Sequence, residues 1–216
     1  MIKQFFNFAV FISVPLLHLN GFGKLLANPG DSFFIEQWEE IESKIDYENS
    51  EIKKLINKVE NHKEKNYLKR ADKLLLEKGR ETEVIRLTTN AIEEQESFLA
   101  YFMRCYAFVE INQNSKAIED CTMALKFNNQ SSSTFNNRGV AYQNLGRNYK
   151  AINDFNKAID LDKQLAVAYW NIFISKYDLG MRKGACNDVK KSVYLGSQTA
   201  RDWIESPNGK WCQNLR

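Results

Sequence analysis

Apolar side chains recur at helical spacing along most of the chain. In residues 132–165, Phe135, Tyr142 and Leu145 lie seven and three residues apart, which places them on one face of a helix. A second stripe of the same kind follows and contains Ile152, Phe155, Ile159 and Leu161. Gly146 lies between the stripes, and glycine readily takes the positive φ that often ends a helix. The segment therefore predicts two antiparallel helices joined by a tight turn.

The same pattern returns when the sequence is shifted by 34 residues. The positions that fall in register are Tyr101, Phe135 and Tyr169; Asn112, Gly146 and Gly180; and Ala117, Ala151 and Ala185. Self-similarity at a fixed period of about 20–50 residues indicates a repeat array. Small residues at fixed points let two helices approach closely, and aromatic side chains fill the space beside them. The sequence predicts an all-α fold with helix pairs at 98–131, 132–165 and 166–197.

The flanking segments are also predicted to be helical. Residues 65–97 are predicted to be a degenerate copy of the repeat, with Gly79 in the turn and Val84 and Ala91 at small-residue positions. Residues 31–63 carry apolar stripes without the repeat pattern, which favours a divergent helical N-terminal cap; a partner-binding or coiled-coil arm is the alternative. Residues 198–216 are predicted to form a capping helix and tail over the last repeat, since a solenoid needs its exposed end covered.

The first residues form a separate segment. Lys3 is the only charge before a mostly apolar run from Phe5 to Leu19, and small residues follow it. A basic start, an apolar stretch of about 7–15 residues and a small-residue exit are typical of a secretory signal. Residues 1–27 are therefore predicted to be a signal peptide or an uncleaved membrane anchor, and the protein is predicted to be exported to a periplasm or lumen.

Composition and motifs argue against several functions. The chain has 216 residues, a net charge of +3 and two histidines, so it lacks the basic footprint of a nucleic-acid-binding protein. No phosphate-binding loop, nucleophile elbow or zinc motif is present in the sequence. We therefore expect no catalytic residues, no metal, no cofactor and no enzymatic activity. Membrane contact is expected only through the N-terminal segment, if it is not cleaved.

The repeat resembles that of the tetratricopeptide repeat (TPR) family. Residues 132–165 match its pattern of small and aromatic positions at Phe135, Gly139, Tyr142, Ala151, Phe155 and Ala158. Some positions depart from the pattern: Arg104 and Arg138 replace a leucine, and the family's closing proline is missing. In residues 166–197, Phe173 replaces a small residue and Lys176 an aromatic one. The resemblance implies a right-handed TPR superhelix, an α-solenoid of antiparallel helix pairs.

The resemblance also implies a binding surface. In TPR proteins, the first helix of each repeat lines a concave groove that holds a peptide. Carried over, the groove residues are Phe102, Tyr106, Asn136, Asn137, Val140, Gln143, Trp170, Asn171, Ile174 and Tyr177. The alternative is that the aromatic side chains pack against neighbouring repeats or caps and that the amides are solvated. Lys73 and Met103 stand where a carboxylate clamp needs asparagine, so we expect no such clamp.

The cysteines are four, and an even number fits disulfide bonds in an oxidising compartment. Cys105 and Cys121 occupy facing positions of one repeat and either bond or serve as small core residues. Cys186 lies in the last repeat and Cys212 in the tail expected to fold over it. Some short exported TPR proteins, notably from cyanobacteria, end in a similar pattern, which implies a Cys186–Cys212 bond that fastens the cap.

Together these features favour a non-catalytic scaffold that holds an unknown protein or peptide in its groove outside the cytoplasm. Two alternatives remain open. One is an assembly or maturation factor for a membrane or periplasmic complex, and the other is a structural protein that associates with itself.

Overall fold

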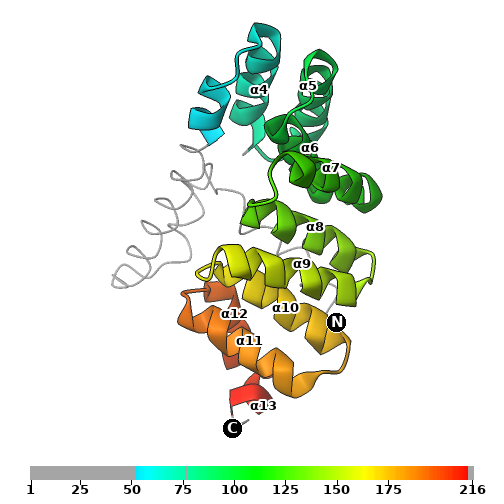
Figure 1. The fold of residues 1–216 in the computed structure, drawn as a ribbon. Coiled ribbons are helices and arrows are strands. Elements are labelled where there is room, and N and C mark those ends of the chain that lie inside the picture. The colour runs from blue at the N-terminus through cyan, green and yellow to red at the C-terminus, as the bar shows by residue number, and fades with distance from the viewer. Residues whose placement is uncertain (1–51, 76, 214–216) are drawn as a thin grey trace, which may run out of the picture. The chain divides into compact units, whose positions relative to one another are not determined.

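The computed structural model describes residues 52–75 and 77–213 (Figure 1). These residues form helices and connecting turns without a strand, which confirms the all-α prediction. They divide into two compact units, one ending at Gln95 and the other beginning at Glu96. The predicted signal peptide or anchor, and most of the predicted cap at 31–63, lie outside the described residues. No helix in the described part is both long and apolar enough to cross a membrane.

The first unit contains one complete helix pair. After a short helical stretch at 52–57, α4 spans His62–Leu75 and α5 spans Glu81–Glu94. The two helices contact each other and bury Leu68 and Ala71 of α4 against Val84, Leu87 and Ala91 of α5. Gly79 takes a φ of 86° in the turn between them.

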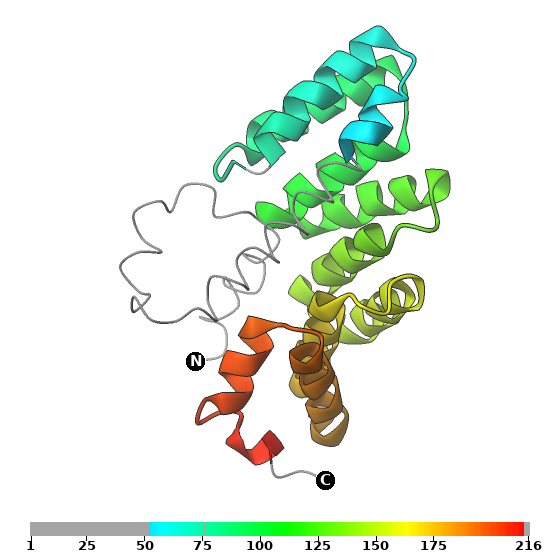
Figure 2. The ribbon, with the colours of Figure 1, turned by 90° about the vertical axis from the view of Figure 1, so that its left-hand side faces the viewer.

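The second unit contains three further helix pairs and a C-terminal cap (Figures 1 and 2). The pairs are α6 Phe98–Glu110 with α7 Asn114–Phe127, α8 Ser132–Asn144 with α9 Asn148–Leu161, and α10 Ala166–Asp178 with α11 Arg182–Tyr194. Two short helices follow, α12 Gln198–Glu205 and α13 Lys210–Gln213, and both contact α11.

The turns within the pairs have the geometry that the glycines predicted. Asn112, Gly146 and Gly180 have φ values of 58°, 70° and 73°. In each turn, the N–H of the residue with positive φ donates to the carbonyl three residues earlier. The next N–H donates to the carbonyl five residues earlier, as Arg147 N does to the Tyr142 carbonyl. These paired bonds form a Schellman motif, which satisfies the last carbonyls of the helix. Asparagine tolerates the left-handed conformation better than most residues, which explains why Asn112 can replace glycine.

The closest approach within each pair is built differently in each repeat. In α8, a Cβ added to Gly139 would lie 2.5 Å from Cε1 of Phe155 in α9, so the absence of a side chain admits the ring. The equivalent residues of the preceding repeat are Cys105 and Cys121, which are joined in a disulfide. In the following repeat they are Phe173 and Val189, both buried. In that repeat the larger side chain belongs to the first helix, and the two side chains together fill the space between the helices.

Candidate functional site

The predicted binding residues lie on three helices that form one continuous layer. α8 contacts both α6 and α10, so the first helices of successive repeats pack side by side. We refer to α6, α8 and α10 together as the first-helix layer.

Buried amides link two helices of this layer. Nδ2 of Asn171 in α10 donates to Oδ1 of Asn136 in α8 at 3.1 Å. Nε2 of Gln143 in α8 donates to the Asn171 carbonyl at 2.8 Å and to Oγ of Ser175 at 2.7 Å. Each of these side chains is buried. Because a buried polar group left without a partner is costly, these bonds hold α8 and α10 in register.

The amide network changes the role expected for three of the predicted residues. Asn136, Gln143 and Asn171 are buried, so they do not present the exposed amide surface that the family resemblance implied. Asn137 is the amide among the predicted groove residues that remains partly exposed. A helix turns by about 100° per residue, so adjacent asparagines such as Asn136 and Asn137 point in different directions.

Two predicted aromatic residues contact other aromatics rather than standing free. Trp170 is 8% exposed, and its ring centroid lies 5.0 Å from that of Phe173. Its indole N–H meets no acceptor in the described part of the chain. The ring of Tyr177 contacts those of Phe173, Trp203 and Trp211. Cζ of Arg182 lies 5.1 Å from the Tyr177 ring centroid. Tyr177 therefore packs against the cap, as in the alternative above, whereas the ring contact of the buried Trp170 lies within α10.

Five predicted residues besides Asn137 keep partial exposure in the first-helix layer. They are Phe102, Tyr106, Val140, Ile174 and Tyr177. Phe102 stacks on Phe98 at 5.6 Å, and Val140 packs against the cluster of Ala151, Phe155 and Ile172. None of the ten predicted groove residues carries a charge at neutral pH.

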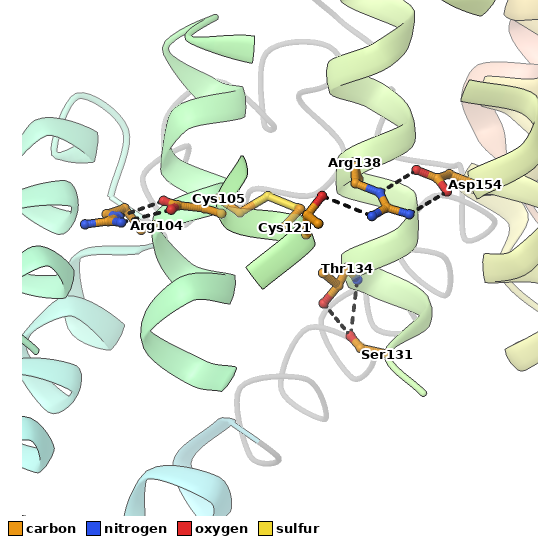
Figure 3. The surroundings of a disulfide bond; sticks show 9 residues. Arg104, Cys105, Cys121, Ser131, Thr134, Arg138 and Asp154 are labelled. Carbon is orange, nitrogen blue, oxygen red and sulfur yellow. Dashed lines mark hydrogen bonds and ion pairs between the residues drawn. A yellow bond between two sulfur atoms is a disulfide. The ribbon is translucent and has the colours of Figure 1, made fainter. Parts of the chain in front are cut away.

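Each of the three repeats holds its two helices together with an ion pair that the predicted sites did not include. Nε and Nη2 of Arg138 donate to the two carboxylate oxygens of Asp154 at 2.7 and 2.9 Å (Figure 3). Arg104 binds Asp120 in the same bidentate way, at 2.6 and 2.9 Å. The aspartates recur at the 34-residue period, which is a signal that the sequence offered. The arginines at the leucine position are therefore one half of a repeated pair.

The third repeat has the aspartate at the same position, but its cationic side chain comes from another position of the first helix. Ile172 occupies the arginine position, and Nζ of Lys176, four residues further along α10, donates to Asp188 at 2.7 Å. Four residues is about one helical turn, so both positions lie on the same face.

Burial raises the pKa of the Asp188 carboxyl above its usual value, although the Lys176 bond and charge act to lower it. Burial acts to lower the pKa of the Arg138 guanidinium, but the bond to Asp154 and its charge leave that pKa raised.

All four cysteines are paired in the structure. Cys105 of α6 and Cys121 of α7 form one disulfide, with Cα atoms 5.3 Å apart (Figure 3). Cys186 of α11 and Cys212 of α13 form the other, with Cα atoms 5.5 Å apart. The Cys186–Cys212 bond that the resemblance implied is thus present and fastens the C-terminal cap to the last repeat, and of the two alternatives for Cys105 and Cys121 the structure has the bond. Within the described residues, no group of histidine, cysteine, aspartate or glutamate side chains could hold a metal ion.

Comparisons with known proteins agree with this architecture. The family model described as tetratricopeptide repeat matches residues 132–165. A crystal structure of MamA is similar at a TM-score of 0.58 and 21% identity, covering 76% of this chain and 96% of that one. YrrB, described as a TPR protein with an unusual peptide-binding site, is similar at a TM-score of 0.57 and 16% identity, over 63% and 71% of the two chains.

A thermophilic TPR protein from Thermus thermophilus is also similar, at a TM-score of 0.58 and 16% identity, over 69% of this chain and 86% of that one. No curated protein sequence matches the chain. At these identities the solved structures show the fold alone. The family match places residues 132–165 in the tetratricopeptide repeat family, and the similar solved structures show that the helix pairs around it have the TPR fold.

Proposed function

We propose that the protein is a non-catalytic scaffold that holds a peptide or protein segment against its first-helix layer, outside the cytoplasm. The fold neighbours support a protein-interaction scaffold, and one of them is described as having a peptide-binding site. The observation that carries the proposal is the layer itself. Three successive first helices pack side by side, and their partly exposed side chains at the family's binding positions are uncharged. Such a surface suits a segment that is held by apolar contacts and amide bonds.

A different set of residues supports the proposed location. Two buried disulfides that use every cysteine of the chain are typical of proteins that mature in an oxidising compartment. This supports the export suggested by the apolar N-terminal segment. Fractionating the native cell and sequencing the N-terminus of the protein in each fraction tests both points, because the fraction gives the location and the sequence shows whether residues 1–27 have been removed.

The binding surface is best tested by site-specific photocrosslinking in the native cell. A photoreactive residue at position 137 lies in the first-helix layer, at the amide that remains partly exposed. A photoreactive residue at position 149 lies on α9 in place of Tyr149, which is 72% exposed. We expect an adduct with a partner from position 137 and none from position 149.

A second pair of variants separates binding from folding. Asn137→Ala with Ile174→Ala should weaken partner capture without lowering the melting temperature by more than a few degrees, because both side chains are only partly buried. Tyr149→Ala with Asn153→Ala changes the same number of side chains on the outward surface and should leave capture intact. Adducts from position 149 alone, or equal capture by both variants, would contradict the proposal. Light scattering across concentrations excludes self-association as the source of an adduct.

A further inference from the structure

The outward side of α11 carries lysines that the proposed function does not use. At about 100° per residue, five side chains of this helix fall within an arc of roughly 100°. They are Lys183, Asn187, Lys190, Lys191 and Tyr194, which we call the α11 face. The opposite side of the helix is buried through Ala185, Val189 and Ser192. Four residues of the α11 face are exposed and Lys190 is partly buried, so the last repeat turns most of this face outward.

The equivalent positions of the two preceding repeats have a different charge. In α7 they are Ser115, Glu119, Thr122, Met123 and Lys126, and in α9 they are Tyr149, Asn153, Asn156, Lys157 and Asp160. Each of these sets has one basic and one acidic residue, whereas the α11 face has three basic residues and no acidic one. The positions match in the repeat, so the difference comes from side-chain choice and not from helix geometry.

The one acidic side chain of α11 does not neutralise this face. Asp188 lies outside the arc and accepts a hydrogen bond from Lys176 of α10. Around the helix, Arg182 lies over the rings of Tyr177 and Trp211, while α12 contributes the exposed residues Asp202 and Glu205. Residues 176–213 contain seven basic and four acidic side chains, a net +3 that equals the charge of the whole chain. The rest of the sequence is therefore balanced, and the excess of positive charge lies in the last repeat and its cap.

Tyr194 adds an aromatic ring to the basic face. It is 80% exposed, the largest exposure among the big apolar and aromatic side chains described, and Nζ of Lys191 lies 4.8 Å from its ring centroid. Tyrosine combines an apolar body with a polar tip, which suits the boundary between lipid and water. Lysine is a compact point charge on a flexible stem, whereas arginine is the residue for bidentate recognition of a single group. The exposed Lys183 and Lys191 beside the exposed Tyr194 therefore fit a diffuse anionic surface.

We propose that the α11 face binds the surface of an anionic lipid bilayer, with the lysines among the headgroups and Tyr194 at the interface. This contact is peripheral and is independent of the N-terminal segment. It also uses second-helix side chains, so it does not depend on the proposed function of the first-helix layer. A protein bound in this way can hold a partner and a membrane at once.

The experiment is co-sedimentation of the full chain with vesicles of phosphatidylcholine alone or mixed with phosphatidylglycerol. A lysine close to an anionic membrane contributes about a five-fold factor in partitioning. Lys183→Glu with Lys191→Glu should therefore lower partitioning onto the anionic vesicles by about 25-fold or more. Tyr194→Ala should lower it by a smaller factor without changing the charge. Binding to neutral vesicles, which measures the N-terminal apolar segment, should not respond to these variants.

Lys126→Glu with Lys157→Glu is the matched control, because it makes the same change in net charge on the outward positions of α7 and α9. Full retention of anionic-vesicle binding by this variant supports the proposal. An equal loss in both double variants would show a general charge effect and overturn it, and so would equal binding of the full chain to neutral and anionic vesicles. Binding to soluble poly-glutamate but not to vesicles would assign the face to an acidic protein and would also overturn it.

Discussion

At the scale of single residues, the size of one side chain decides how closely two helices approach. Gly139 and Phe155 share one space, which in the neighbouring repeats is filled by a disulfide or by Phe173 with Val189. Protein interiors are close-packed, so a volume added at one of these positions has to be removed at the other. At these two positions, the departures of the neighbouring repeats from the TPR pattern are therefore paired substitutions.

Gly139→Ala should destabilise the protein by about 1–3 kcal/mol, because the new methyl group would overlap the ring of Phe155. The free energy of unfolding in urea measures this cost. Gly184→Ala in α11 is the matched control, since its Cβ would make only an ordinary contact, 3.4 Å from Cδ of Lys176. That control should stabilise the protein by about 0.5–1 kcal/mol, because alanine favours the helix over glycine. Equal effects of the two substitutions would contradict the packing argument.

At the scale of helices, each of the three pairs in the second unit is joined by one partly buried ion pair. The side chain of Asp154 is 3% exposed and that of Arg138 is 15% exposed, so both charges depend on their mutual contact. Nη1 of Arg138 also donates to Oγ1 of Thr122, in the second helix of the preceding repeat, at 3.1 Å. The arginine therefore connects two repeats as well as the two helices of its own.

Arg138→Leu should destabilise the protein by about 3–5 kcal/mol, because it leaves the Asp154 carboxylate buried without its partner. Adding Asp154→Ala to this variant should recover most of the loss, since no buried charge then remains and leucine is the usual TPR residue at that position. A double-mutant cycle on the free energy of unfolding measures the coupling. If the double variant is as unstable as Arg138→Leu, the ion pair is not the cause.

At the scale of the whole molecule, stability in a repeat array is the sum of local contacts between neighbours, so the ends need their own means of closure. The C-terminal end is closed by aromatic packing and by a covalent bond. Trp203 of α12 lies 4.4 Å from Phe173, and Trp211 of α13 lies beside Tyr177. The Cys186–Cys212 disulfide joins α13 to α11, although α13 has only four residues.

Cys186→Ser with Cys212→Ser should release α13 from the last repeat. A four-residue helix has little stability of its own, so its amides should exchange hydrogen much faster once the bond is lost. Hydrogen exchange read by mass spectrometry over residues 206–213 measures the change. In the control, Cys105→Ala with Cys121→Ala, these amides should keep their protection even though the protein is destabilised. Unchanged exchange in the serine variant would show that the aromatic contacts alone hold the cap.

The sequence by itself determined the helix pairs, their period and their turns. These features depend on local properties, namely the spacing of apolar residues along one helix and the tolerance of Gly146, Gly180 and Asn112 for positive φ. The small and aromatic positions were also enough to place residues 132–165 in the family. The binding surface could be predicted only as a set of positions, because a pattern along one helix does not say what the next repeat contributes.

The tertiary structure decided which of these positions remain exposed. Asn136, Gln143 and Asn171 bond across α8 and α10, and Tyr177 packs against Trp203 and Trp211 of the cap, because the packing of the helices brings partners distant in sequence within reach. The same packing joined Cys105 to Cys121, a bond that the sequence left open. Hydrogen bonds and disulfides require particular distances and angles, and these are set only when the helices have packed.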